Sequence, residues 1–258
     1  MKVGLLQCDD VADDLLSAHG NYPQMFEQAL RKRLPQMHYR VYQAHRGELP
    51  ADVHECDVYL TTGSKHGVYE DYAWIRELEG FVRSLWAEEK PLVGVCFGHQ
   101  LMARAMGGHV QKSERGWGVG VSFNQVIEPQ PWMQPAQDSL DLIVSHQDQV
   151  IDLPAQAQVI ASSDFCPHYL LQYGDCFLSV QGHPEFEKAY SRDLMDMRSH
   201  SIPPARVRAE ALIADPPETA GPPPFKAGDK VSHATFGQGI VVNCGPKPSD
   251  YEVTVAFK

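Results

Sequence analysis

Short apolar runs alternate with amphipathic stretches along the first 200 residues of this 258-residue chain. Residues 25–34 and 74–89 have the apolar spacing of helices, whereas the short runs around them are typical of buried strands. Strands that alternate with helices favour an α/β fold, in which a mostly parallel sheet is covered by helices on both faces. The strands predicted in this part are 2–8, 39–43, 57–61 and 91–95.

A second group of apolar runs follows residue 117, and we expect some of these strands to be antiparallel. The predicted strands are 118–127, 140–144, 158–161, 169–172 and 176–181. Two further helices are predicted at 193–199 and 205–213. The alternating pattern ends there, so we predict a main domain of residues 1–213.

Proline density separates a short C-terminal piece from the main domain. Residues 214–224 read Ala-Asp-Pro-Pro-Glu-Thr-Ala-Gly-Pro-Pro-Pro, which prevents a helix or a central strand and favours an extended linker. Beyond the linker, glycines mark turns between β-like segments at 230–234, 239–243 and 252–257. Residues 225–258 are therefore predicted to form a small β module.

Charge and cysteine content narrow the class of protein. The formal net charge is −11, and residues 201–258 hold six basic and six acidic residues, so all of the acidic excess lies in residues 1–200. An acidic body repels phosphates and anionic lipid, so we expect a small-molecule substrate, no nucleic acid and no membrane. The N-terminal apolar run is too short for a signal peptide, which predicts a cytoplasmic protein with free thiols.

The stretch with the clearest chemistry is Pro91-Leu92-Val93-Gly94-Val95-Cys96-Phe97-Gly98. An apolar strand runs into Gly-x-Cys-x-Gly and a helix follows, which is the nucleophile-elbow pattern with cysteine as the nucleophile. We expect the glycines to allow close backbone approach and the helix N-terminus to favour a thiolate at Cys96. The backbone N–H of Phe97 would face the oxygen of an attacked carbonyl group.

A base for this thiol is predicted from Gly182-His183-Pro184-Glu185, which follows an apolar strand. His183 can carry protons to a leaving group, and Glu185 can hold the imidazole in one tautomer. A second oxyanion donor should come from the loop after a neighbouring strand, and the backbone N–H of Gly63 is the candidate. The cysteines and histidines lack metal-ligand spacing, so we expect no metal and no cofactor.

Together these segments resemble the class I, triad-type, glutamine amidotransferase domains over about residues 1–200. The resemblance implies a flavodoxin-like fold and hydrolysis of a γ-glutamyl amide through a γ-glutamyl thioester on Cys96. One of the segments that carry this resemblance, residues 145–150, is similar to a stretch of the glutaminase domain of GMP synthases. The segments that carry the resemblance are the Cys96 elbow with His99-Gln100, His183-Pro184-Glu185, Thr62-Gly63-Ser64 and Ser145-His146-Gln147-Asp148-Gln149-Val150.

The resemblance also implies which residues hold the substrate. Gln100 and the backbone near Ser145, His146 and Gln147 would bind its α-amino and α-carboxylate ends, and residues 114–118 would line the same pocket. No synthetase domain is recognised in these 258 residues. Two further segments, 20–26 and 63–71, look like the stand-alone branch of the family, which is similar to GMP-synthase-like amidotransferases and γ-glutamyl peptidases.

Residues 228–241 resemble the Tudor-like β module that ends bacterial UvrD/PcrA-type helicases. The matching pattern is Gly-Asp-x-Val-x-His-x-x-Phe-Gly-x-Gly, with a β-like segment later in the chain. The charge of this tail is too small for strong phosphate binding. Docking to a protein partner and packing onto the main domain both remain open for it.

Two other functions stay open from the residues alone. An intracellular cysteine peptidase could use the same scaffold, and a weakly active glutamine-sensing adaptor could act through the C-terminal module. His183-Pro184-Glu185 on a separate late strand, with His99-Gln100 after the elbow, argues against the peptidase. The intact set of Cys96, His183 and Glu185 argues against the adaptor. Free glutamine and a γ-glutamyl peptide are equally open as its substrate.

Overall fold

The computed structural model describes residues 1–199, 202, 230–233, 237–247 and 250–257. The chain divides into two compact units, Met1–Ile213 and Ala214–Lys258. The predicted helix 205–213 and the predicted linker 214–224 lie outside the described residues.

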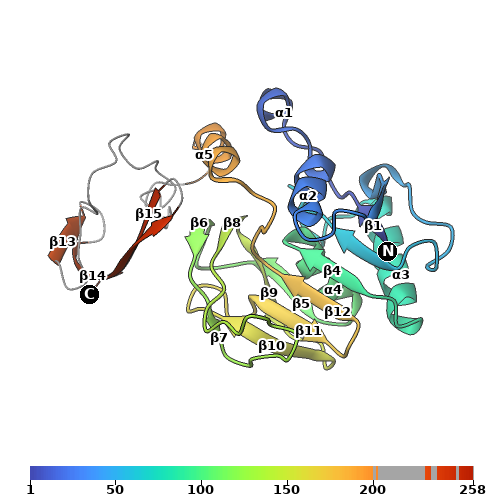
Figure 1. Cartoon of the computed structure of the whole chain (residues 1–258). Helices are drawn as coiled ribbons and strands as arrows, with labels where there is room; N and C mark the ends of the chain where they lie inside the picture. The colour runs from blue at the N-terminus through green and yellow to red at the C-terminus, as the bar shows by residue number, and fades with distance from the viewer. Residues whose placement is uncertain (200–201, 203–229, 234–236, 248–249, 258) are drawn as a thin grey trace. The chain divides into compact units, whose positions relative to one another are not determined.

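An eight-stranded sheet forms the centre of the first unit, with the strand order β2-β1-β3-β4-β12-β11-β10-β7 (Figure 1). Neighbouring strands are parallel from β2 to β12, and each of the last three strands is antiparallel to its neighbour. This confirms the predicted mostly parallel sheet with antiparallel strands late in the chain. The strands are β1 (Lys2–Leu6), β2 (His38–Tyr42), β3 (Val58–Thr61), β4 (Leu92–Val95), β7 (Gln125–Val126), β10 (Ala157–Ser162), β11 (Leu170–Tyr173) and β12 (Phe177–Val180).

Alternation along the parallel strands places one hydrophobic cluster on each face of the sheet. Leu6 and Tyr59 pack in a cluster with apolar residues of helices α3 and α4, whereas Leu5 and Leu60 pack on the other face with Phe26 of helix α2. Successive strand residues point to opposite faces, so both faces are buried. The helices are α1 (Asp13–His19), α2 (Tyr22–Arg31), α3 (Ala73–Ala87), α4 (Phe97–Ala105) and α5 (Lys188–Met197), with a 3₁₀ turn η1 (Ala44–Arg46).

Two antiparallel pairs and a three-stranded sheet complete the described structure. One pair joins β5 (His109–Lys112) to β9 (Asp148–Asp152), and the other joins β6 (Gly118–Ser122) to β8 (Leu142–His146). The second unit contains the sheet β13-β14-β15. Its strands are β13 (Lys230–His233), β14 (Gly237–Lys247) and β15 (Asp250–Phe257), and each overlaps a predicted strand.

Three elements of the first unit were not expected from the sequence. Helix α1 is seven residues long, and its N-cap Ala12 makes no side-chain capping hydrogen bond, so it carries little start signal. Strands β5 and β9 pair with each other and have mixed, partly exposed residues that lack a clean alternation. The predicted strand 118–127 is split into β6 and β7, which pair with different partners.

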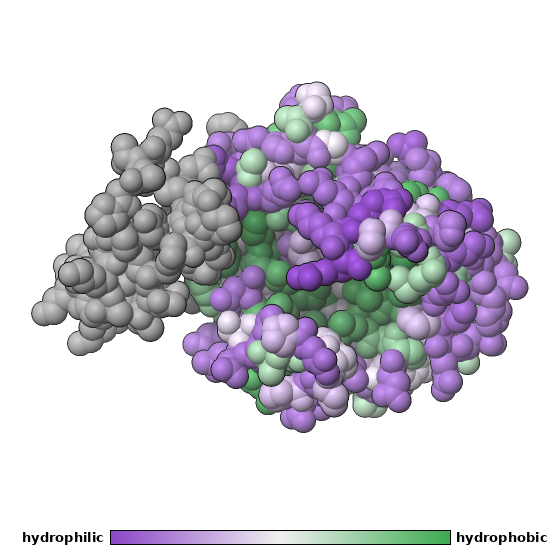
Figure 2. Space-filling view, in the orientation of Figure 1, coloured by the Kyte–Doolittle hydropathy of each residue, from purple (hydrophilic) through white to green (hydrophobic). Residues whose placement is uncertain are grey.

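Hydrophilic residues cover most of the face of the first unit that Figure 2 shows. In the view of Figure 2, hydrophobic residues gather in a hollow across the middle of this face, between hydrophilic margins. In the part of the chain that the structure describes, none of the helices has the length and apolar character needed to span a bilayer.

Candidate functional site

The loops that follow four parallel strands meet at one edge of the sheet. Strands β1, β3, β4 and β12 are consecutive neighbours and run in the same direction, so their carboxyl ends lie together. Cys96 comes directly after β4, Gly63 comes two residues after β3, and His183 comes three residues after β12. The sheet order therefore brings together residues that are far apart in the sequence.

Cys96 occupies a sharp turn between strand β4 and helix α4. Its backbone angles are φ 51° and ψ −100°, a conformation that residues other than glycine rarely adopt. Its N–H donates to the carbonyl of Val180 on strand β12 at 2.9 Å, and its carbonyl accepts the N–H of Gln100 at 3.1 Å. The turn thus projects the thiol from the sheet edge above the first turn of α4, as the nucleophile-elbow pattern predicts.

The two glycines that flank the cysteine allow the strand and the helix to pack closely. A Cβ at Gly94 would lie 2.8 Å from the carbonyl oxygen of Gly98, and a Cβ at Gly98 would overlap the hydroxyl of Thr61. Real Cβ atoms do not tolerate such contacts, so this elbow requires glycine on both sides of the nucleophile.

His183 reaches Cys96 from strand β12 and is held on three sides. Its ring Nδ1 lies 2.7 Å from Glu185 Oε1, and its ring stacks on Phe186 with centroids 3.8 Å apart. Its backbone N–H donates to the carbonyl of Ile143 at 2.8 Å. The Cys96 side chain lies close enough to the imidazole to interact with it electrostatically. The structure therefore brings Cys96, His183 and Glu185 together.

The charge of His183 follows from its two acidic neighbours. Burial by itself lowers the pKa of the imidazole, but Glu185 and Cys96 outweigh burial and raise this pKa to about 10. His183 is 5% exposed, and the side chain of Glu185 is fully buried. The Glu185 Oε2 atom has no hydrogen-bond partner among the described residues. A protonated imidazole compensates this buried carboxylate.

Gly63 lies against both Cys96 and His183. A Cβ built on Gly63 would be 2.9 Å from His183 Cε1 and 3.6 Å from Cys96 Cβ. The preceding residue, Thr62, fixes the loop because its Oγ1 accepts the N–H of Cys8 at 2.9 Å and donates to the carbonyl of Gly63 at 2.9 Å. This position suits the second oxyanion donor, opposite Phe97 at the start of helix α4.

A cavity of about 380 Å³ opens above Cys96. One wall is the segment after Gly63, and the opposite wall is the turn between strands β8 and β9. All four predicted substrate-binding residues line it, together with Phe97. The lining residues are Ser64, Lys65, His66, Gly67, Tyr69, Glu70, Cys96, Phe97, Gln100, Lys112, Trp117, Ser145, His146, Gln147, Asp148 and Arg198.

The side chains of two residues predicted at the substrate, Gln100 and His146, are committed to internal hydrogen bonds. The Gln100 amide nitrogen donates to the carbonyl of Asp148 at 2.8 Å and to Gln181 Oε1 at 3.1 Å. The Nδ1 of His146 bonds the same Asp148 carbonyl at 3.1 Å, and burial lowers the pKa of His146 to about 4. Both side chains therefore fix the β8–β9 turn, and His146 is neutral at pH 7.

Sequence reasoning missed two charged residues of the cavity, Arg198 and Lys112, and quoted a third, Asp148, without giving it a role. Arg198 follows the last turn of helix α5, and its guanidinium donates to Ser145 Oγ at 3.1 Å. Lys112 ends strand β5, and Asp148 lies against Tyr69 with its pKa raised by burial. No local motif marks Arg198 or Lys112, because tertiary packing alone brings them to the cavity. Of the predicted segment 114–118, Trp117 lines the cavity.

Of the cysteines whose side chains are described, Cys96 alone lines the cavity. Cys8, Cys56 and Cys166 are buried free thiols, and Cys176 is partly buried. Burial raises the pKa of Cys8 and of Cys166 to about 12, so both are neutral thiols at pH 7. Among the described residues, no group of three or more His, Cys, Asp or Glu side chains is arranged to hold a metal ion.

Comparison with protein families finds one match in each unit. A family model described as glutamine amidotransferase class-I matches residues 30–195, and one described as PcrA/UvrD tudor domain matches residues 227–258. Among curated proteins, γ-glutamyl peptidase 2 of Arabidopsis thaliana is 29% identical over 78% of this chain and 82% of its own length. γ-Glutamyl peptidase 4 of the same plant is 32% identical over 58% of this chain and 62% of its own length.

The fold is also found among solved structures. A glutamine amidotransferase from Thermotoga maritima superposes with a TM-score of 0.64 at 20% sequence identity. The superposition covers 77% of this chain and 83% of that one. The expected flavodoxin-like fold is therefore confirmed by structures as well as by strand order.

Proposed function

Since this chain belongs to the class I glutamine amidotransferase family, we propose that it cleaves γ-glutamyl amides with Cys96 as nucleophile, His183 as acid and base, and Glu185 as the residue that orients His183. The chain is an enzyme on the amidotransferase scaffold, and its relatives include proteins named γ-glutamyl peptidases. The observation that carries the proposal is the convergence of His183 and Gly63 on Cys96, which itself lines the cavity.

In the first half of the proposed reaction, the Cys96 sulfur attacks the γ-carbonyl carbon of the substrate. The carbonyl oxygen becomes an oxyanion that accepts hydrogen bonds from the N–H groups of Gly63 and Phe97. The C–N bond then breaks as His183 gives its proton to the departing nitrogen, which leaves a γ-glutamyl thioester on the sulfur. The raised pKa of His183 suits this step, because the imidazole is already protonated at pH 7.

In the second half, water attacks the thioester and His183 acts as the base. The imidazole takes a proton from the water, the C–S bond breaks, and glutamate leaves as the Cys96 thiolate forms again next to protonated His183. Glu185 holds the ring through Nδ1 in both halves, so that Nε2 is the nitrogen that exchanges protons. No cofactor is needed for either step.

Covalent labelling tests the proposed nucleophile. A γ-glutamyl chloromethyl ketone, with its carbonyl next to the reactive carbon, should attach to Cys96 alone, as located by mass spectrometry. Cys166 is the matched control, because it is also buried and has a pKa raised to about 12. Cys96→Ala should abolish glutamate release, whereas Cys166→Ala should retain it. Turnover by Cys96→Ala within about tenfold of the parent would remove Cys96 from this role.

The substrate can be glutamine or a γ-glutamyl peptide, and both fit the proposed chemistry because the γ-carbonyl is the same. The names of the relatives support the peptide, and the charged residues of the cavity walls offer contacts to more than a primary amide. Rates of glutamate release from glutamine and from γ-glutamyl dipeptides, compared as kcat/KM, decide between them.

A further inference from the structure

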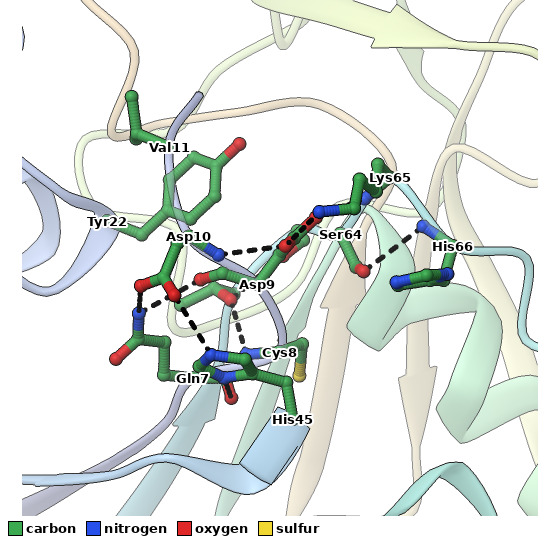
Figure 3. Close-up of polar contacts among 12 residues, drawn as sticks. Gln7, Cys8, Asp9, Asp10, Val11, Tyr22, His45, Ser64, Lys65 and His66 are labelled. Carbon is green, nitrogen blue, oxygen red and sulfur yellow. Dashed lines mark hydrogen bonds and ion pairs between the residues drawn. The ribbon is translucent and has the colours of Figure 1, made fainter. Parts of the chain in front are cut away.

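A buried carboxylate that the mechanism above does not use lies beside the loop of residues 62–66. We call this segment the oxyanion loop, because it contains Gly63. Asp9 follows strand β1 and is 5% exposed. Its Oδ2 accepts the backbone N–H of Lys65 at 2.8 Å. Its Oδ1 accepts the Lys65 ammonium at 3.1 Å and the backbone N–H of Asp10 at 2.9 Å. Figure 3 shows the Asp9 side chain directed at Lys65.

Hydrogen bonds hold the oxyanion loop on both sides of Gly63, and the Asp9 carboxylate accepts one of them. Before it, Thr62 donates its N–H to the carbonyl of Leu6 at 3.2 Å and accepts the Cys8 N–H on its hydroxyl. After it, the Asp9 carboxylate takes the N–H of Lys65. Gly63 and Ser64 are the residues between the two anchors. The stretch that contains Gly63 is therefore held at both ends by residues of β1 and of the segment after it.

The bond to the Lys65 backbone is the part of this arrangement that water cannot easily replace. The Lys65 side chain is 63% exposed, whereas that of Asp9 is 8% exposed. An ion pair with an exposed lysine contributes little to stability. A buried carboxylate that accepts hydrogen bonds from backbone N–H groups makes strong, directional bonds. The carboxylate thus acts on the loop chiefly through the backbone.

We propose that Asp9 is a positioning residue for the oxyanion loop, which sets Gly63 against Cys96 and His183 through the backbone of Lys65. The inference rests on the proposed function of that loop. Asp9 does not touch the reacting atoms, so its loss should lower kcat while KM changes little.

Two substitutions of Asp9 and one of its neighbour test the inference in the full chain. Asp9→Ala removes every acceptor, and Asp9→Asn leaves one acceptor oxygen where three donors converge. Asp10→Ala is the matched control, because Asp10 is held by Gln7, Asn21, His45 and Arg46 and by no residue of the loop 62–66 among those described. We expect about a 10- to 100-fold loss of kcat in Asp9→Ala, a smaller loss in Asp9→Asn, and a kcat within threefold of the parent in Asp10→Ala.

Thiol reactivity supplies a readout that a general loss of stability would not give. The γ-glutamyl chloromethyl ketone develops charge on its carbonyl oxygen and needs the oxyanion donors, whereas iodoacetamide alkylates a thiolate without them. Asp9→Ala should therefore react more slowly than the parent with the ketone and equally fast with iodoacetamide. If Asp9→Ala does not fold, the same two rates measured on Asp9→Asn decide.

The outcomes separate this inference from the proposed function. A folded Asp9→Ala with parent-like kcat and parent-like ketone labelling overturns the role of Asp9 while hydrolysis by the parent stands. Equal losses of kcat in Asp9→Ala and Asp10→Ala also overturn it, because they indicate a general structural effect. If Cys96→Ala keeps the parent activity, the proposed function itself fails, whatever the Asp9 variants do.

Discussion

Gly63→Ala adds one methyl group at the point where the proposed oxyanion loop meets the base. The new carbon would lie 2.9 Å from His183 Cε1, whereas carbon atoms in good contact are about 3.5–4.0 Å apart. The ring cannot retreat easily, because it stacks on Phe186 and is held by Glu185 at 2.7 Å. The distance between the two carbon atoms must therefore increase by roughly 0.6 Å or more, and most of this movement must come from the loop.

Such a displacement moves the Gly63 N–H away from the carbonyl oxygen that it is proposed to bind. Misplacement of a catalytic group by about 1 Å can lower the rate by about 100-fold, so we expect Gly63→Ala to lower kcat by about 10- to 100-fold. Measurement of glutamate release over a range of substrate concentrations gives kcat and KM, and a thermal melt shows whether the variant is folded.

Gly80→Ala is the control for adding a methyl group to a glycine. Gly80 lies in helix α3, and a Cβ there meets no atom within 4 Å. Alanine favours a helix by about 1 kcal/mol relative to glycine, so this variant should melt at a slightly higher temperature with unchanged kcat. A folded Gly63→Ala with the kcat of Gly80→Ala would refute the assigned place of Gly63 in the site.

Three further predictions concern orientation, pH and the C-terminal unit. Glu185→Gln should lower kcat less than Cys96→Ala does, because Glu185 orients the base without bonding to substrate; equal losses in glutamate release would contradict this ranking. Burial lowers the pKa of His99 to about 3, so stability should be lost as pH falls below the unfolded value of 6.5, by about 2 kcal/mol at pH 5. Urea titrations at pH 7.5 and pH 5 should show a smaller loss of unfolding free energy in His99→Gln than in the parent. Equal losses in the two proteins would contradict the assignment of this pH dependence to His99. Deleting residues 225–258 should leave kcat/KM within about twofold, since the cavity-lining residues among those described all precede residue 199; a large drop would assign the tail to the site.

The parts of the site that the sequence predicted are those with a local pattern. Cys96 stands in a strand-glycine-helix segment whose sequence pattern lies within four positions of it. His183 and Glu185 are two residues apart at the end of a strand, so their contact is also local. The sheet order that brings the two segments together came from the resemblance to a family, since spacing alone does not define it.

The parts that were missed depend on contacts between distant segments. Arg198 reaches Ser145 from another element, and no pattern around either residue encodes that contact. Helix α2 is a different case: Asn21 and Gln24 form a capping box that places its start at Tyr22, although apolar spacing alone predicted a start at residue 25. Capping residues would have corrected that boundary.

The backbone conformation of Cys96 restricts which residues can replace it at this position. A side chain branched at Cβ crowds its own backbone at a φ of 51°, so threonine is a poor replacement even though it carries a hydroxyl. Serine has the same branching as cysteine and fits the turn. Any lineage that exchanges sulfur for oxygen chemistry on this scaffold is therefore expected to pass through serine, with the elbow itself unchanged.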